Sequence, residues 1–231
     1  AAGCTIIIKP SNETPGPAVG IIRCFQDAGV PAGVIGLIFG PPGPISEHLI
    51  ASPIPKKVSL TGSTPVGKHL QKLAAETLKR CTMELGGHAP VLVFADTDLE
   101  RTLDLLVASK FRNAGQVCTS PTRFYIHRSI YEAFVKGFVE RTERLVVGNG
   151  MEAGVVMGPL ITEKRMDNMD ELVTDALANG AQVLTGGTGL DREGSSFAPT
   201  VLRDVPDSAM IMNGEPFGPV AALTAFDSYE E

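Results

Sequence analysis

Short apolar runs rich in β-branched residues alternate with helical segments through the first third of the chain, and this alternation limits the folds open to it. The runs occupy residues 4–8, 34–39 and 58–60. Continuous apolar runs bounded by glycine or proline are typical of buried strands in parallel sheets. Between them, prolines in the first turn and Gly29 beyond the end predict a helix over about 15–28, and a shorter helix is predicted near 46–51. This order of elements predicts the α/β class.

A Gly86-Gly87 pair separates two further predicted strands, at 82–85 and 90–95. We place a domain boundary at this tight link. The expected domains are residues 1–85 and residues 86–231.

The second domain is predicted to continue the alternation of helices and strands. Capping boxes that start at Thr97 and Ser129, each with a glutamate three residues on, predict the first turns of two helices. The first of these helices leads directly to Cys118. The other expected elements are a strand at 122–127, a helix around 162–178, and strands near 182–185 and 220–226.

Composition excludes several classes of protein. With 231 residues and 43% hydrophobic content, the chain can bury a core in one large or two small domains. Its net charge is −6 and its basic residues are scattered, so a nucleic-acid partner is not expected. No apolar run approaches the ~18 residues of a membrane span, and we expect a soluble protein without a membrane partner.

The four cysteines and four histidines show no metal-binding pattern. No CxxC pair is present, and no spacing suggests a zinc site or a disulfide framework. The histidines lack the i,i+4 spacing of a helical metal site, so no metal is predicted. Free thiols are the default in a reducing compartment, which favours a cytoplasmic location.

Residues 111–120 hold one cysteine, Cys118, just after the small or polar residues Asn113, Ala114 and Gly115. A cysteine where a helix passes into a loop suits nucleophilic catalysis, because glycine admits close approach and backbone N–H groups can face an oxyanion. The alternative is a small buried hydrophobic residue, which is the commoner role of a cysteine.

A helix is also predicted after Gly62-Ser63, with Thr64 as its cap and Pro65 in its first position. Its free N–H groups and positive dipole end could bind an anion such as a pyrophosphate. The segment is not a GxGxxG fingerprint, and by itself an ordinary capped helix is the better interpretation. The expected apolar face comprises Val66, Leu70, Leu73, Ala74, Thr77 and Leu78.

Met83-Glu84-Leu85-Gly86-Gly87 stands 34 residues upstream of the thiol. Together with Gly115-Gln116-Val117-Cys118 it resembles the aldehyde dehydrogenase superfamily. Four further motifs occur in the order of that family: Lys9-Pro10, Gly62-Ser63-Thr64-Pro65-Val66-Gly67, Gly158-Pro159-Leu160 and Glu215-Pro216-Phe217-Gly218-Pro219.

The resemblance implies an aldehyde dehydrogenase fold, with part of a Rossmann-like NAD(P)-binding domain followed by most of a catalytic domain. It implies that Cys118 is the nucleophile, that Glu84 is the general base and that the Cys118 backbone N–H helps to hold the oxyanion. The substrate would be a small aldehyde, and NAD or NADP would be the cofactor. The implied cofactor-binding residues are Lys9, Asn12, Gly62, Ser63, Gly67, Leu85, Glu215 and Phe217.

Cofactor preference depends on Lys9 and Asn12. Family members that prefer NAD often carry a glutamate at the position of Asn12, where it repels a 2′-phosphate. A neutral amide removes this repulsion and Lys9 could pair with phosphate, so we expect tolerance of NADP. Glu13 lies one residue further and could compensate.

Arg112, six residues before Cys118, resembles the arginine with which the succinate semialdehyde dehydrogenase branch grips a distal carboxylate. Where that branch often has a second cysteine this chain has Ser120, which excludes a regulatory disulfide in the loop. An arginine at a helix end could instead interact with carbonyls or solvent. Glutarate semialdehyde, a simple aliphatic aldehyde, or a catalytically inactive fragment that keeps the fold are the alternatives.

Members of the resembled family are much longer than this chain. We therefore expect an internal fragment of a parent enzyme that is a homo-oligomer. The family's second oxyanion donor, a side-chain amide, would lie upstream of Ala1.

Overall fold

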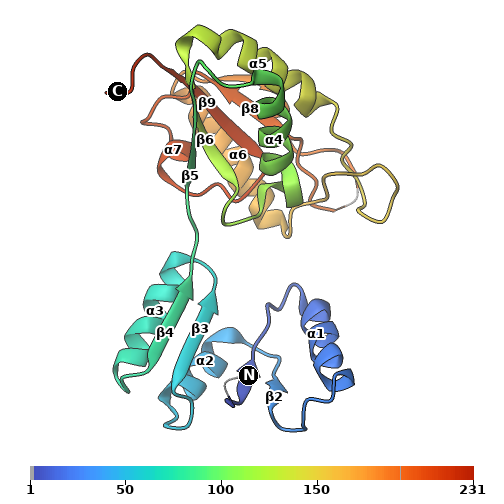
Figure 1. The fold of residues 1–231 in the computed structure, drawn as a ribbon, viewed down its shortest axis with the longest axis vertical. Helices are drawn as coiled ribbons and strands as arrows, with labels where there is room; N and C mark the ends of the chain where they lie inside the picture. The colour runs from blue at the N-terminus through green and yellow to red at the C-terminus, as the bar shows by residue number, and fades with distance from the viewer. Residues whose placement is uncertain (1–2, 193) are drawn as a thin grey trace. The chain divides into compact units, whose positions relative to one another are not determined.

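The computed structural model describes residues 3–192 and 194–231. Two compact units make up the chain, Ala1–Leu85 and Gly86–Glu231. Both combine parallel strands with helices (Figure 1), and the predicted α/β class is confirmed.

Two parallel strand pairs form the N-terminal unit. β1 (Ile6–Ile8) pairs with β2 (Ile35–Leu37), and β3 (Lys57–Thr61) pairs with β4 (Arg80–Glu84). The helices are α1 (Pro15–Asp27), α2 (Pro42–Ala51) and α3 (Thr64–Ala75).

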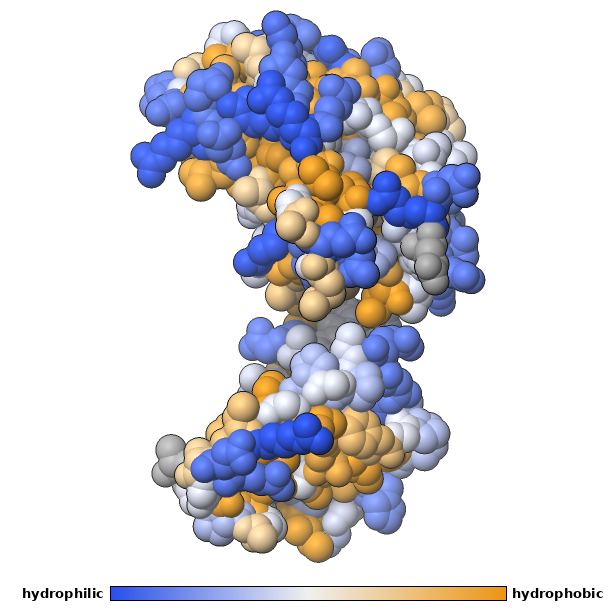
Figure 2. All heavy atoms as spheres, turned by 90° about the vertical axis from the view of Figure 1, so that its right-hand side faces the viewer, coloured by the Kyte–Doolittle hydropathy of each residue, from blue (hydrophilic) through white to orange (hydrophobic). Residues whose placement is uncertain are grey.

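The core of the N-terminal unit is small. Ile50 of α2 packs with Leu70 and Ala74 of α3, and the inner side chains of β3 and β4 lie against them. The first strand was predicted to be buried, and this prediction is wrong: Ile6 and Ile7 are 52% and 55% exposed. β1 pairs with β2 in a two-stranded sheet, and α1 buries no residue. Little of this unit therefore covers Ile6 and Ile7, and apolar side chains reach its surface (Figure 2).

The C-terminal unit is built on one five-stranded sheet in the order β5-β6-β9-β8-β7. Its strands are β5 (Ala89–Val93), β6 (Pro121–His127), β9 (Val220–Phe226), β8 (Thr200–Arg203) and β7 (Gln182–Thr185). All neighbours are parallel except β7, which runs antiparallel to β8. The parallel pairing brings the amino ends of β5, β6 and β9 to one edge of the sheet.

Helices α4 (Leu99–Phe111) and α5 (Arg128–Glu143) cover the face of the sheet that carries Phe124. The Phe124 ring lies 5.3 Å from that of Phe138 of α5, in an edge-to-face arrangement. Phe124, Phe138 and Leu103 of α4 are completely buried. The remaining helices are η1 (Arg112–Gly115), α6 (Glu163–Ala178) and α7 (Met210–Asn213). This unit therefore has a continuous core with large aromatic anchors.

The helix starts differ from the predicted caps. Asp98, not Thr97, caps α4 by accepting from the Arg101 N–H at 3.2 Å, since a carboxylate is an equally good cap and adds favourable charge at the dipole. His127, not Ser129, caps α5 through its Nδ1. Glu132 of the expected capping box instead binds Arg203 at 2.8 Å.

Helix lengths in the N-terminal unit were also partly wrong. α2 begins at Pro42, four residues before the helix predicted near 46–51, because prolines fit a first helical turn. Ser63 is the cap of α3, and Thr64 is already helical. α3 ends at Ala75, so Leu78 lies outside its apolar face, with φ +53° and 92% exposed. The strand β8 was not predicted.

Candidate active site

The candidate nucleophile lies at the amino edge of the sheet in the C-terminal unit. Gly86-Gly87 precede β5, Cys118 lies three residues before β6, and the segment 215–219 precedes β9. Because these strands are parallel neighbours, three motifs that are distant in sequence come to one edge.

Close backbone contacts hold these segments together. A Cβ on Gly87 would lie 3.2 Å from the Cys118 carbonyl oxygen, and one on Gly115 would lie 2.2 Å from the Gly218 carbonyl oxygen. A Cβ on Gly86 would overlap the Glu215 carboxylate. The contact of Gly115 with a backbone carbonyl therefore requires glycine, whereas a side chain at Gly86 or Gly87 would need the Glu215 carboxylate or the Cys118 carbonyl to shift.

The loop that delivers Cys118 has an uncommon backbone. Asn113, Ala114 and Gly115 all have positive φ values, of 51°, 53° and 70°. Such a conformation is unfavourable for alanine and persists only where surrounding contacts enforce it. Cys118 follows in a turn closed by the Ser120 N–H bonded to the Val117 carbonyl at 2.9 Å, and its thiol is exposed. The buried alternative for this cysteine is therefore wrong.

Glu215 and Phe217 lie directly before β9. The Glu215 Oε1 atom is buried and has no hydrogen-bond partner among the described residues. A buried carboxylate oxygen without a partner costs free energy, so this atom is suited to receive a donor from a bound molecule. Arg165 of α6 lies over the Phe217 ring, 5.2 Å from its centroid.

Arg112 ends α4 and starts η1, and its side chain is exposed. No described residue forms a hydrogen bond or an ion pair with its guanidinium group. The predicted substrate residue is thus a solvent-accessible cation on the loop of Cys118.

Sequence reasoning missed a buried polar group behind this loop. Lys110 is fully buried, its Nζ has no partner among the described residues, and burial lowers its pKa to about 7. Burial, and then the charges of Arg123 and Lys110, lower the pKa of His88. The helical position of Lys110, directly before Phe111 on an apolar face, was the available signal.

In the N-terminal unit, the cofactor candidates gather at the carboxyl ends of β3 and β4. The Gly62 N–H donates to the Glu84 carbonyl at 3.0 Å. Leu85 packs on Gly67, where a Cβ would lie 2.6 Å from its Cδ2. Ser63, the cap of α3, is exposed and makes no side-chain bond to the helix, so its hydroxyl and the first-turn N–H groups are not used in a cap hydrogen bond.

Lys9 and Asn12 also come together. Lys9 directly follows β1, and its Nζ donates to Asn12 Oδ1 at 2.7 Å and to the Pro10 carbonyl at 2.8 Å. None of the ion pairs among the described residues includes Lys9, so its charge is not neutralised by a carboxylate there.

The candidates thus fall into two groups. Cys118, Arg112, Glu215 and Phe217 belong to the C-terminal unit, whereas Glu84, at the exposed end of β4, belongs to the N-terminal unit with the other cofactor candidates. No cluster of His, Cys, Asp or Glu in the described residues could hold a metal ion. Of the helices in residues 3–192 and 194–231, none has the length and apolar content to cross a membrane.

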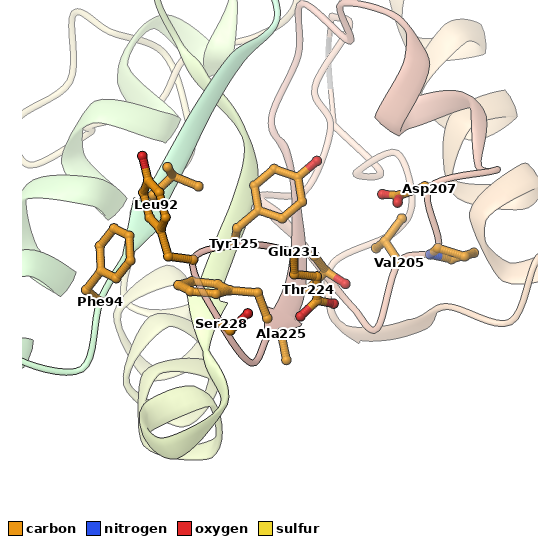
Figure 3. Close-up of a pocket in the computed structure, with 12 residues that line it drawn as sticks. Leu92, Phe94, Tyr125, Val205, Asp207, Thr224, Ala225, Ser228 and Glu231 are labelled. Atoms are coloured by element: carbon orange, nitrogen blue, oxygen red, sulfur yellow. The ribbon is translucent and has the colours of Figure 1, made fainter.

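A cavity of ≈ 520 Å³ lies at the other end of the same strands (Figure 3). Leu92 and Phe94 line it from β5 and the loop after it, Tyr125 from β6 and Thr224 from β9. None of the candidate residues lines this cavity, which is therefore separate from the candidate active site.

The aldehyde dehydrogenase family model matches residues 1–231, the whole chain. The chain belongs to the aldehyde dehydrogenase family. The resemblance inferred from the motifs is confirmed, and with it the expected fold.

Individual relatives cover the chain from end to end. It is 46% identical over 231 residues to a putative 4-(hydroxymethyl)benzenesulfonate dehydrogenase of Comamonas testosteroni, covering 48% of that protein. It is 41% identical over 226 residues to the NADP(+) succinate-semialdehyde dehydrogenase of Escherichia coli K12, covering 47%. The structure of succinate-semialdehyde dehydrogenase from Burkholderia pseudomallei matches 99% of the chain with a TM-score of 0.97 and 41% identity, over 48% of that chain. The chain spans about half the length of the relatives it matches.

Proposed function

We propose that this aldehyde dehydrogenase chain carries the catalytic residues and much of the cofactor site of an enzyme that oxidises an aldehyde to a carboxylic acid. One aldehyde, one NAD(P)+ and one water would give the acid, NAD(P)H and a proton. The observation that carries the proposal is the amino edge of the C-terminal sheet. There the backbone of Cys118, whose thiol is exposed, and the carboxylate of Glu215, whose Oε1 is buried and unpartnered, both lie close to the Gly86-Gly87 segment that directly follows Glu84-Leu85 in the sequence.

Cys118 would attack the aldehyde carbon as the thiolate, forming a carbon–sulfur bond while the carbonyl oxygen becomes an alkoxide. Its own backbone N–H would stabilise that oxyanion. The adduct would become a thioester by losing a hydride from this carbon, for which NAD(P)+, when bound, supplies the acceptor. Glu84 would then take a proton from water, whose oxygen displaces the Cys118 thiolate from the thioester and gives the acid.

Several features of the chain fit a dinucleotide. The N–H groups at the start of α3, which no side chain caps, and the Ser63 hydroxyl suit a pyrophosphate, next to Gly62. Leu85 packs on Gly67, and this contact joins the end of β4 to the first turns of α3, beside the proposed pyrophosphate site. Glu215 Oε1 needs a donor, which a ribose hydroxyl would supply, and the Phe217 ring would pack at the nicotinamide end.

We propose that the enzyme accepts NADP as well as NAD. The hydrogen bond from Lys9 to Asn12 orients a cation beside a neutral amide, and Lys9 forms no ion pair among the described residues. Lys9 would attract a 2′-phosphate there, and residue 12 carries no carboxylate that would repel it. Glu13 belongs to the same loop, where its backbone N–H donates to Ser11 Oγ. Its carboxylate is therefore the group that could oppose the binding of a 2′-phosphate.

We propose a small semialdehyde with a distal carboxylate, such as succinate semialdehyde, as the substrate. Arg112 supports this, because its guanidinium is exposed on the Cys118 loop and can bind a carboxylate through two parallel hydrogen bonds. Glutarate semialdehyde or a simple aliphatic aldehyde remain the alternatives. The expected domain roles are cofactor binding for residues 1–85 and catalysis for residues 86–231, in a cytoplasmic homo-oligomeric parent.

The first test measures the intact mass of the native protein and then the oxidation of succinate semialdehyde with each cofactor, followed as NADH or NADPH absorbance. We expect Cys118→Ser to abolish turnover, and Glu84→Gln to slow it by at least about 100-fold because general-base catalysis is lost. Unchanged turnover in Cys118→Ser would exclude the covalent mechanism.

The substrate is tested separately with Arg112→Leu. We expect KM for succinate semialdehyde to rise at least about 10-fold, with little change for butanal, because a bidentate pair contributes more than 1.4 kcal/mol. Arg144→Leu is the matched control, since Arg144 is exposed at the end of α5. Equal effects of Arg112→Leu on both aldehydes would overturn the carboxylate role.

A further inference from the structure

We propose that Gln116 is a positioning residue that clamps the Cys118 loop to the segment 158–161 and so fixes the nucleophile for reaction. The inference rests on the proposed function, because it concerns the same thiol. It also gives a role to the Gly158-Pro159-Leu160 motif, which the catalytic assignments above leave without one.

The Gln116 side chain spans two loops that are more than 40 residues apart in sequence. Its Nε2 donates to the Asn113 carbonyl at 3.2 Å and to the Pro159 carbonyl at 3.4 Å. Its Oε1 accepts from the Ile161 N–H at 3.0 Å. Both N–H donors and the oxygen of one amide are therefore used, which is three of the four hydrogen bonds that the group can form.

The loop is further closed by reciprocal bonds. The Gln116 backbone N–H donates to the Asn113 carbonyl at 3.1 Å, and Asn113 Nδ2 donates to the Gln116 carbonyl at 3.1 Å. These bonds enclose Asn113, Ala114 and Gly115, the three residues with left-handed backbone conformation. These bonds offset the free-energy cost of the left-handed conformation. Without them, we expect the turn to relax to a more favourable backbone conformation.

The segment 158–161 is a firm anchor for this clamp. Leu160 is 3% exposed and Met157 is 1% exposed, so the segment is held by the core of the C-terminal unit. The Leu160 N–H also donates to the Ser195 carbonyl at 2.8 Å. Gln116 thus transfers the rigidity of the core to a loop whose own tip, Cys118-Thr119, is exposed.

Position matters here because the thiolate and the oxyanion-holding N–H belong to the same residue. A shift of the loop by about 1 Å would misalign both at once, and displacements of that size cost about 100-fold in rate. Gln116 lies two residues before Cys118 and touches no reacting atom in this scheme. Its removal should therefore lower kcat while substrate and cofactor affinities change little.

The test compares Gln116→Met and Gln116→Glu with wild type in the longest native protein that contains this chain. Methionine keeps the length without hydrogen bonds, whereas glutamate keeps the acceptor for Ile161 but turns an oxygen toward the two carbonyls. Gln182→Met is the control, because Gln182 is exposed on β7 and its side chain has no hydrogen bond among the described residues. The measurements are kcat and KM, and amide hydrogen exchange of the peptides 112–120 and 158–162.

For both Gln116 variants we expect kcat to fall about 10- to 100-fold and KM for NADP to stay within about twofold, since only alignment is lost. Exchange should accelerate in those two peptides and nowhere else, and Gln182→Met should match wild type. If Cys118→Ser is inactive but Gln116→Met keeps wild-type kcat and exchange, the clamp is overturned and the proposed function stands. If Cys118→Ser remains active, the proposed function fails, and accelerated exchange in Gln116→Met would still support the clamp.

Discussion

The two units carry their candidate residues at opposite edges of their sheets. In the N-terminal unit, Lys9 follows β1, Ser63 follows β3 and Leu85 follows β4, so this site lies at the carboxyl ends of the strands. In the C-terminal unit, Cys118 precedes β6 and Glu215 precedes β9, at the amino ends. Open α/β sheets ordinarily bind ligands at the carboxyl ends, so only the N-terminal unit follows the general rule.

The difference has an electrostatic consequence. At a carboxyl edge the chain enters a helix, so N–H groups and the positive dipole end face the ligand, as at Ser63 before α3. At an amino edge the chain arrives from the end of a helix, as at Arg112 after α4, where the end of the helix dipole is negative. The first edge therefore suits an anionic group such as a phosphate, and the second suits a cationic group.

The units also differ in how firmly they are packed. The C-terminal core contains completely buried aromatic rings, such as Phe134 and Phe138, which stack with centroids 5.6 Å apart. The N-terminal core has three buried apolar residues, Ile50, Leu70 and Ala74. A strained loop therefore persists in the C-terminal unit because rigid surroundings hold it, whereas stability changes in the N-terminal unit should be small and local.

The largest effect is expected from Gly115→Ala. A Cβ there would lie 2.2 Å from the Gly218 carbonyl oxygen, at a φ of +70°. Backbone strain and the overlap together should lower the free energy of unfolding of the C-terminal unit by about 3–5 kcal/mol. All three tyrosines, Tyr125, Tyr131 and Tyr229, lie in this unit and the chain has no tryptophan, so urea unfolding followed by tyrosine fluorescence reports on it alone.

Gly154→Ala is the matched control for that experiment. Gly154 has a similar φ of +83° but no atom within 4 Å of the added Cβ, so only the backbone cost of about 1 kcal/mol should appear. Equal losses in the two variants would show that the contact with Gly218 is not tight, and the rigidity assigned to the amino edge would be wrong.

Lys110→Met should stabilise the C-terminal unit. The folded unit releases the Lys110 proton above about pH 7, whereas the unfolded chain keeps it to about pH 10. Wild-type stability should therefore rise with pH between these values, by up to about 1.4 kcal/mol per pH unit, and be lowest below pH 7. The methionine variant should lack this slope and be more stable by about 2 kcal/mol or more near pH 7.

As a control, the measurement of unfolding free energy against pH needs a lysine whose charge is already exposed to solvent. Lys164→Met serves, because Lys164 is exposed on α6. This control should keep the wild-type slope. A Lys110→Met variant that unfolds with the same pH dependence as wild type would mean that Lys110 is paired in solution.

Most elements could be predicted from the sequence, and the failures have local causes. β9 and β7 were predicted near their observed bounds, 220–226 and 182–185, because short, mainly apolar runs with glycine, proline or charged residues at their ends leave few alternatives. β8 was missed because four residues after a long loop carry no periodic signal. The caps failed where neighbouring residues compete: Asp98 and Thr97 can both accept from a first-turn N–H.

The candidate site was predictable only in part. Cys118 and Glu84 lie in motifs that can be read from single segments, so the family could be inferred from them. The meeting of Gly87, Cys118 and Gly218 at one edge depends on the strand order β5-β6-β9, which no local pattern specifies. The hydrogen bonds from Gln116 to the segment 158–161 and the burial of Lys110 likewise depend on the tertiary structure.

Gly67→Ala tests the carboxyl edge of the N-terminal unit. The added Cβ would lie 2.6 Å from Leu85 Cδ2, the flexible end of a side chain. The helix-propensity gain of about 1 kcal/mol should offset the displacement of Leu85, leaving stability nearly unchanged. If the proposed cofactor site is correct, KM for NADP should rise about 10-fold, a loss of about 1.4 kcal/mol. The double variant Gly67→Ala, Leu85→Ala should recover most of the lost NADP affinity. If KM for NADP did not recover, the contact between Gly67 and Leu85 would not be the cause of the loss.

The smallest effect is expected from Leu78→Gly, in the turn after α3. Leu78 is 92% exposed with φ +53°, so its side chain contributes little burial while its backbone is unfavourable. Glycine should stabilise this turn by about 0.7 kcal/mol, and exchange of the α3 amides should slow about threefold. Leu78→Ala keeps the backbone cost and should give no gain. If alanine slowed exchange as much as glycine, the gain in stability would come from removing an exposed apolar side chain. The left-handed backbone at Leu78 would then carry no cost in the N-terminal unit.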